Sequence, residues 1–236
     1  MTFSMKRMVA IFQKDLKDLS KNMFVGTAFI LPFMMAFLYR NMDTNSIEEH
    51  YLVINLAFVS IAFFVQCALI AEEKEMNTLR GLMLSPATIP EILGGKSLVS
   101  FILTIVTIII CTKFTGYQPN HLVLISVALL LSLIFYLAVG TMLGLLAKTV
   151  VEASIIMMPV VFVFGFSSFI PMLADKYPVL SFAEYLPSVQ LVEFAKDIQA
   201  GSGLVDTWHY LLIILGWLVL AVFLTIAVYR KKELDD

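Results

Sequence analysis

Charged residues are scarce in this sequence. They make up 14% of its 236 residues, whereas 60% of the residues are hydrophobic, and a soluble domain carries about 25% charged residues. The charges stand in short clusters between long apolar runs, which is the pattern of a protein that crosses the membrane several times. The formal net charge of -2, without a basic patch, indicates no nucleic-acid partner.

Cysteine and histidine are also rare. Cys67 and Cys111 both fall inside apolar runs, and two residues are too few for a disulfide framework or a zinc site, so we expect small buried side chains. The three histidines, His50, His121 and His209, stand at the borders of the apolar runs. We therefore expect no metal site. About twenty polar and amphipathic residues precede the first run, which is unlike a cleavable signal peptide.

The apolar runs themselves define the expected fold. A helix needs roughly 20 apolar residues to cross a bilayer, and six runs qualify: 23–39, 52–71, 92–111, 122–147, 153–173 and 210–229. The sequence thus predicts an all-α polytopic membrane protein with six transmembrane helices in a single domain over 1–236. Most lysines and arginines lie on the side of the N-terminus, so both termini and the polar segment 72–91 are predicted to be cytoplasmic in a plasma (inner) membrane.

Two further segments are predicted to form helices outside the spans. Residues 1–22 have an apolar stripe with lysines mostly on the other face, as in a helix that lies in the membrane interface. The stripe consists of Met5, Met8, Val9, Phe12, Leu16 and Leu19. This helix either anchors the first span or docks a partner. Segment 174–208 is predicted to be a short extracellular hairpin of two helices, with Ser188 as a candidate N-cap and with Gly201 and Gly203 ending the second helix.

Several kinds of chemistry are disfavoured. The "GGKS" at 94–97 would need a glycine five residues before Gly95 to form a phosphate-binding loop, and that position is Pro90. We interpret Lys96 as a cationic anchor at the cytoplasmic edge of the third span. A membrane prenyl endopeptidase would place an arginine four residues after the glutamate pair, whereas Arg80 follows Glu73 by seven. The sequence therefore does not predict an enzyme.

Ion-coupled transport is also disfavoured, because no carboxylate lies within the six runs. Mild polar residues such as Asn55 and Gln66 are expected to form hydrogen bonds between helices. Gly140 and Gly144 allow close helix approach.

The cytoplasmic segment "EMNTLRGLMLSP" has a pattern of its own. Met76, Leu79, Leu82 and Met83 fall on one side of a short helix, and Pro86 ends it. An apolar stripe on an exposed, charged loop is typical of a helix that docks in the groove of a partner. The alternative is a helix that folds back on its own bundle or on lipid headgroups.

The run "AEEKEMNTLRGLMLSPATIPEILGGKSL" resembles the segment between spans two and three of the ABC-2 type transporter permeases. The matching residues are Glu73, Lys74, Glu75, Thr78, Leu79, Leu82, Ser85, Pro86, Gly95 and Lys96. Asn77 and Arg80 depart from the usual glycine and glutamate. "YLPSVQLVEFAKDI" is similar to the stretch before span six in that family.

This resemblance implies a permease subunit of an ATP-driven ABC exporter of an amphiphilic drug, antimicrobial peptide or lipid-linked substrate. The implied partners are two copies of a separate ABC ATPase, which binds ATP and Mg²⁺, a second permease subunit, identical or paired, and membrane lipid. This chain itself is expected to bind no cofactor. The implied ATPase-coupling residues are Glu72, Glu73, Glu75, Thr78, Leu79, Leu82, Met83 and Pro86.

A translocation path is predicted to include Phe162, Phe164, Phe166 and Phe169, with Asn55 and Gln66. The rival hypothesis is a non-transporting scaffold or sensor subunit that recruits a cytoplasmic partner.

Overall fold

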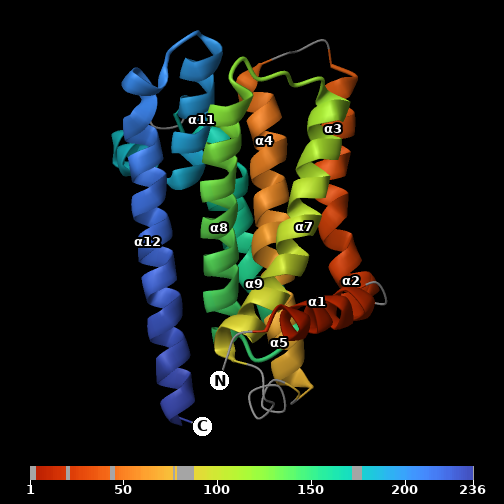
Figure 1. The fold of residues 1–236 in the computed structure, drawn as a ribbon. Helices are drawn as coiled ribbons and strands as arrows, with labels where there is room; N and C mark the ends of the chain where they lie inside the picture. The colour runs from red at the N-terminus through yellow and green to blue at the C-terminus, as the bar shows by residue number, and fades with distance from the viewer. Residues whose placement is uncertain are drawn as a thin grey trace.

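Helices of this chain run side by side along one axis, and one amphipathic helix lies across them at one end (Figure 1). The computed structural model describes residues 4–19, 22–42, 46–76, 78, 88–171 and 177–235, and within these ranges every regular element is helical. The crossing helix is α1 (Met5–Leu19). The end of α5 (Phe64–Glu75) and the C-terminal end of α12 (Leu204–Asp235) lie at the same end of the bundle as α1 (Figure 1).

Within the described residues, four helices are long and apolar enough to cross a membrane: Ile47–Glu75, Glu91–Thr115, Leu122–Leu146 and Leu204–Lys231. The first is continuous through α4 (Ile47–Ala57), the π-helical η2 (Phe58–Phe63) and α5 (Phe64–Glu75). The others are α7 (Ile89–Thr115), α8 (Leu122–Leu146) and α12 (Leu204–Asp235). They coincide with the second, third, fourth and sixth predicted runs.

The first and fifth predicted runs contain shorter apolar helices, Thr27–Arg40 and Val150–Gly165. The helix Thr27–Arg40 comprises η1 (Thr27–Phe29) and α3 (Ile30–Arg40), and α2 (Met23–Gly26) precedes it. The second comprises α9 (Val150–Val160) and the π-helical η3 (Val161–Gly165), and η4 (Ser167–Phe169) follows. Both are shorter than the roughly 20 residues that a straight crossing needs, so six spans stay a prediction.

The helix Ile47–Glu75 is the centre of the bundle. All residues of the most apolar stretch of this helix are buried (100%), whereas 22% to 39% of the corresponding residues are buried in the other three long helices. Helix α8 approaches it at two glycines, as their spacing indicates. A Cβ atom on Gly140 would lie 2.5 Å from the Phe63 carbonyl oxygen, and one on Gly144 would lie 2.8 Å from the Cys67 oxygen. Small residues thus bring two backbones together, as is common between membrane helices.

The segment before α12 packs into the bundle. It consists of the 3₁₀ helix η5 (Pro178–Tyr185) and α11 (Pro187–Gln199), and most of α11 is buried, between α12 and the central helices (Figure 1). The prediction that Ser188 caps α11 is wrong, because Pro187 already occupies the first turn and Leu186 is the N-cap. Proline is favoured there, since its fixed φ suits the helix and its missing N–H needs no partner. Gly201, at φ 97°, follows the end of the helix as predicted.

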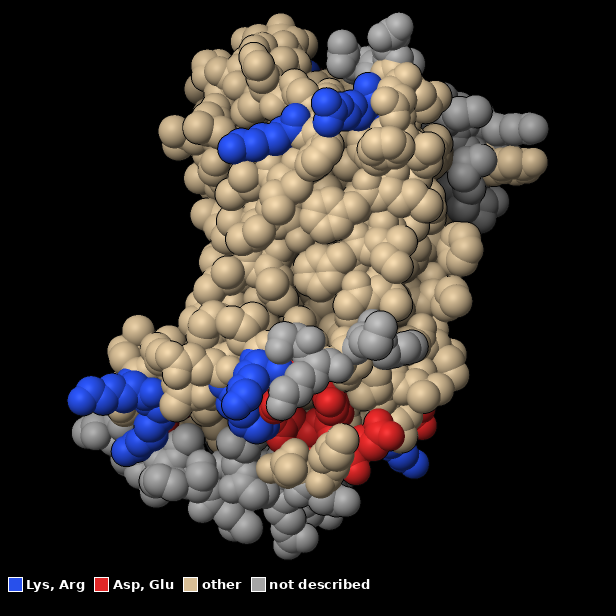
Figure 2. Space-filling view, turned by 90° about the vertical axis from the view of Figure 1, so that its right-hand side faces the viewer, with Lys and Arg blue, Asp and Glu red and all other residues tan. Residues whose placement is uncertain are grey.

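Charged side chains on one face gather at two levels, with a broad uncharged belt between them (Figure 2). The larger group lies at the end of the bundle that carries α1, where acidic and basic side chains adjoin. An uncharged belt between two charged levels is what a membrane-spanning bundle requires.

Candidate functional site

The predicted coupling segment, 72–91, begins in the last turn of α5. Of the predicted coupling residues, the structure describes those next to the bundle: Glu72, Glu73, Glu75 and Thr78. The apolar ones lie outside the described residues: Leu79, Leu82, Met83 and Pro86.

Lys74 and Glu75 join the end of α5 to the connection between α8 and α9. The Lys74 ammonium donates to the carbonyl oxygen of Leu145, at 2.7 Å, and to that of Ala147. These carbonyls end α8, where a cation is favoured by the helix dipole. Glu75 accepts a hydrogen bond from the Val150 backbone N–H, at 3.0 Å, in the first turn of α9. The start of the coupling segment is thus fixed to the ends of two neighbouring helices.

Glu73 belongs to a buried ion cluster with Lys14, Asp15 and Lys96. The Lys96 Nζ atom lies 3.0 Å from Glu73 Oε1 and 3.0 Å from Asp15 Oδ2. The Lys96 side chain is 0% exposed, that of Asp15 3% and that of Glu73 6%. Lys14, at the rim, also pairs with Glu73, and the Thr78 hydroxyl donates to the same carboxylate. The interpretation of Lys96 as an interface anchor is therefore wrong, because its ammonium is enclosed between two helices.

Helix α1 contributes two titratable groups to this cluster, Asp15 and Lys14, and both have a raised pKa. Burial raises the pKa of the Asp15 carboxyl above its usual range, although Lys96 and Lys14 oppose this shift. Burial lowers the pKa of the Lys14 ammonium, but the hydrogen bond and charge of Glu73, together with the charges of Asp15 and Asp18, outweigh burial, and the net pKa is raised. Lys14 therefore stays charged in the folded protein, whereas the ionised form of Asp15 is held at a cost.

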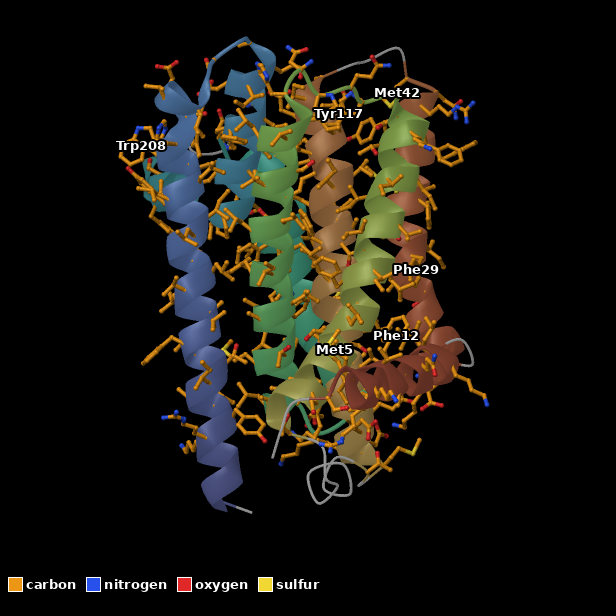
Figure 3. The ribbon with its side chains drawn as sticks, in the orientation of Figure 1. Met5, Phe12, Phe29, Met42, Tyr117 and Trp208 are labelled. Carbon is orange, nitrogen blue, oxygen red and sulfur yellow. The ribbon has the colours of Figure 1, made fainter. Side chains whose placement is uncertain are left out.

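Helix α1 crosses α7 at the glycine pair of the "GGKS" motif. A Cβ atom on Gly95 would lie 2.9 Å from Ile11 Cβ and 2.9 Å from the Met8 carbonyl oxygen, and one on Gly94 would lie 3.4 Å from Met8 Sδ. The two glycines thus allow α1 and α7 to pack closely. This packing brings the neighbouring Lys96 against α1. Phe12, on the same helix, packs against the buried core, as does Phe29 (Figure 3).

The predicted apolar stripe of α1 only partly faces the bundle. The buried residues of the helix are Ile11, Asp15 and Leu19. Met5 and Val9, two residues of the predicted stripe, are 60% and 40% exposed. This second apolar side is available to a membrane interface, so the interface location stays a prediction.

Glu91 ties the beginning of α1 to the beginning of α7. It forms a capping box with Thr88, whose backbone N–H lies 2.6 Å from Glu91 Oε2. The same carboxylate accepts from the Ser4 backbone N–H and pairs with Arg7 at 3.4 Å. Both ends of the coupling segment therefore meet α1, one through Glu73 and the other through Glu91.

A cavity of about 590 Å³ opens beside the ion cluster. Most of the residues that line it are acidic or polar: Lys14, Asp15, Asp18, Asn22, Leu69, Glu72, Glu73, Met76 and Thr78. Across it, Glu72 accepts a 3.4 Å hydrogen bond from Asn22, between α1 and α2. Within the described part of the chain, no three His, Cys, Asp or Glu side chains converge as metal ligands.

The predicted path residue Gln66 is a hydrogen-bond centre between three helices. Its Nε2 donates to Ser97 Oγ of α7, at 3.1 Å, and to Thr141 Oγ1 of α8, at 3.0 Å. Its Oε1 accepts from Ser100 Oγ, at 3.0 Å. Gln66 is fully buried, so in this conformation it joins α5, α7 and α8.

Asn55 has a similar position nearer the other end of the bundle. Its Nδ2 donates to Ser167 Oγ, at 3.0 Å, and contacts the Ser188 carbonyl oxygen, at 3.5 Å. Asn55 therefore connects α4 with η4 and α11.

The four predicted path phenylalanines divide into two groups. Phe164 turns inward and packs against Phe135, at a ring-centroid distance of 6.0 Å. Phe162 and Phe169 are 69% and 46% exposed, and Phe166 lies between them at 6.2 Å and 6.5 Å. The structure thus does not bring the four rings together into one lining.

Comparison with known proteins decides the family. The model of a family described as "ABC-2 family transporter protein" matches residues 28–229, which is most of the chain. The chain belongs to the ABC-2 transporter family. It is accordingly a multi-pass membrane protein and the permease component of an ABC transporter. A search of curated proteins finds no match.

The ion cluster of this ABC-2 permease was missed by sequence reasoning. The sequence pattern that could have indicated this cluster lies in α1. Asp15 is four residues from both Ile11 and Leu19 and therefore lies on the same helix face. An acidic residue in the middle of a buried stripe calls for a buried cation. Nothing in the sequence identifies Lys96 as that cation, because it lies 81 residues away.

Proposed function

We propose that this permease has six spans and exports an amphiphilic substrate, powered by a separate ATPase that docks on the coupling segment 72–91. ATP and Mg²⁺ would bind to the ATPase, of which two copies serve two permease subunits, identical or paired. This chain would bind no cofactor, and its termini would lie on the cytoplasmic side of a plasma membrane.

One observation carries this proposal: the two ends of the coupling segment are joined to several helices at once. At one end, Lys74 and Glu75 hold α8 and α9, while Glu73 reaches α1 and α7. At the other end, Glu91 holds α1. A force applied to the segment would therefore reach much of the bundle, as a transporter driven from outside its own chain requires.

The glutamates of the segment support a more specific docking hypothesis. Glu73 and Glu75 are engaged inside the chain, so they are suited to shaping the segment. Contact with the ATPase then falls mainly to the predicted apolar side, Leu79, Leu82 and Met83, by docking of a helix in a groove.

An amphiphilic drug, antimicrobial peptide or lipid-linked cargo suits the apolar character of the bundle. The exposed Phe162 and Phe169 would meet such a cargo or the second permease, whereas Gln66 and Asn55 would reach it only after the bundle opens. The alternative function is a non-transporting scaffold or sensor subunit, which would bind a cytoplasmic partner without nucleotide-driven movement.

The experiment is co-purification of the tagged chain with the ATPase from a neighbouring reading frame. We expect Leu82→Asp to abolish association, because a charge in an apolar groove is left without a partner. Leu122→Asp is the matched control, since Leu122 is an exposed leucine at the opposite end of the bundle, and it should associate normally. Undiminished association of Leu82→Asp would contradict the docking assignment, and ATP-independent export would contradict the powered permease.

A further inference from the structure

We propose that Lys96 is a positioning residue that links the amphipathic helix α1 to the coupling segment, through the chain Thr78–Glu73–Lys96–Asp15. This inference rests on the proposed role of segment 72–91 in coupling. It assigns to α1 a part in transmission, in addition to any anchoring in the membrane.

The first argument is the position of the ammonium group. Lys96 follows the coupling segment in sequence, and Glu73 stands at the beginning of that segment, 23 residues before Lys96. Asp15 comes from α1, 81 residues away from Lys96. One fully buried cation thus stands 3.0 Å from carboxylates of two different helices. A shift of the end of α5 relative to α1 therefore alters the arrangement of the two carboxylates around this ammonium.

The second argument is the route by which movement enters the chain. Thr78 belongs to the coupling segment, and its hydroxyl donates to the Glu73 carboxylate and, at 3.2 Å, to the Glu73 carbonyl oxygen. A displacement of the segment therefore acts on Glu73 first, and through Glu73 on Lys96 and Asp15.

The third argument concerns which contacts are rigid. Helices α1 and α7 meet closely at Gly95, where a single added Cβ would clash with Ile11 and with the Met8 backbone. Their N-terminal ends are also joined through Glu91. These two helices therefore behave as one body.

The end of α5, in contrast, is joined to this pair through side chains. Lys14 of α1 and Lys96 of α7 both reach Glu73, and Asn22, which follows α1, donates to Glu72. The cavity of about 590 Å³ lies along this side. It gives the end of α5 space to shift. The geometry thus makes the ion cluster an adjustable joint between the end of α5 and the pair formed by α1 and α7, whereas the Gln66 hydrogen bonds join α5 to α7 farther inside the bundle.

The fourth argument weighs this role against simple stabilisation. A buried ion pair is weak evidence for stability, because the desolvation of the two charges offsets most of their attraction, and apolar residues of similar size often serve as well. What such a pair supplies is a defined geometry between the elements that carry it. A methionine in place of Lys96 would fill the space but hold neither carboxylate.

The test measures the distance between α1 and the end of α5. Spin labels are placed on introduced cysteines at the exposed positions Gln13 and Met76, in chain diluted with unlabelled protein. The native Cys67 and Cys111 are buried. We expect one narrow distance distribution in the wild type and a broad or multiple distribution in Lys96→Met. Lys96→Arg should restore the narrow distribution, and Lys148→Met, which removes an exposed lysine, should leave it unchanged.

Since Lys96→Met leaves two carboxylates buried, Glu73→Gln serves as a second variant that keeps the shape of the side chain. It should broaden the same distribution. A distribution as narrow as that of the wild type in either folded variant would overturn the proposal. The distance is measured on the permease alone, so a failure of the wild-type chain to bind the ATPase contradicts the proposed function and not the ion link.

With the ATPase bound, replacing ADP by a non-hydrolysable ATP analogue should change the distance between labels at Gln13 and Leu122 in the wild type. The change should be lost in Lys96→Met while ATPase association persists. An unaltered nucleotide response in Lys96→Met would likewise overturn the proposal.

Discussion

Replacing Gly140 by alanine adds one methyl group at the closest approach of α8 to the central helix. The new Cβ would lie 2.5 Å from the Phe63 carbonyl oxygen and 3.1 Å from both Phe63 Cα and Gln66 Cβ. Two of these atoms belong to backbone and cannot rotate away, so α8 must retreat by roughly 1 Å to restore ordinary contact. A gap of this size removes about a quarter to a half of the dispersion attraction between the atoms it separates.

We therefore expect Gly140→Ala to lower the free energy of unfolding by about 1–3 kcal/mol, the usual cost of overpacking. Gly216→Ala is the matched control. Gly216 also lies inside a long apolar helix, α12, but a Cβ there would meet nothing within 4 Å. It should be neutral or stabilising by up to about 1 kcal/mol, since alanine favours the helix over glycine.

The assay is denaturant unfolding in mixed micelles, followed by far-ultraviolet circular dichroism. The reasoning is refuted if Gly140→Ala and Gly216→Ala unfold at the same denaturant concentration, because helix propensity alone would then account for both.

Two further perturbations address the polar interior. Gln66→Leu removes three hydrogen bonds between helices, each worth about 0.6 kcal/mol in a membrane. We therefore expect the free energy of unfolding to fall by about 2 kcal/mol in the same assay. An unchanged denaturant concentration at the midpoint would contradict this expectation. Asp15 faces Lys96 of α7, Glu73 of α5 and Lys14 of its own helix, and burial raises its pKa. A carboxyl group whose pKa is raised in the folded state contributes stability at low pH, and this contribution is lost as the pH rises through the folded-state pKa. The stability of the wild type relative to Asp15→Asn should therefore increase from pH 7 towards about pH 4. Parallel curves of stability against pH for the two proteins would contradict this expectation.

The sequence predicted the long helices well, because membrane spans depend on local composition. Apolar runs of sufficient length mark α7, α8 and α12 without any knowledge of their neighbours. The family resemblance also rested on local motifs, and the match over residues 28–229 confirms it.

The sequence did not predict how the polar residues pair. From the sequence, the "GGKS" motif was tested as a phosphate-binding loop, and its lysine was interpreted as an anchor at the membrane edge. The role of the glycines in helix packing depends on Met8 and Ile11, which belong to a helix far away in the chain. The amphipathic pattern of α1 likewise predicted the helix correctly but only part of its buried side. Asp15 is charged, so the sequence pattern places it on the exposed side unless its buried partner Lys96 is known. Pairing between distant segments is a property of the packed bundle, which a single sequence does not display.

The burial of the helix Ile47–Glu75 has a consequence for biosynthesis. This helix leaves the ribosome before α7, α8 and α11, which supply the hydrogen-bond partners of Asn55 and Gln66. Until those helices are made, both amides would have to face lipid, which is unfavourable. The nascent chain would therefore benefit from being held at the insertion machinery until α11 has been synthesised, so that the centre of the bundle enters the membrane together with the helices that surround it.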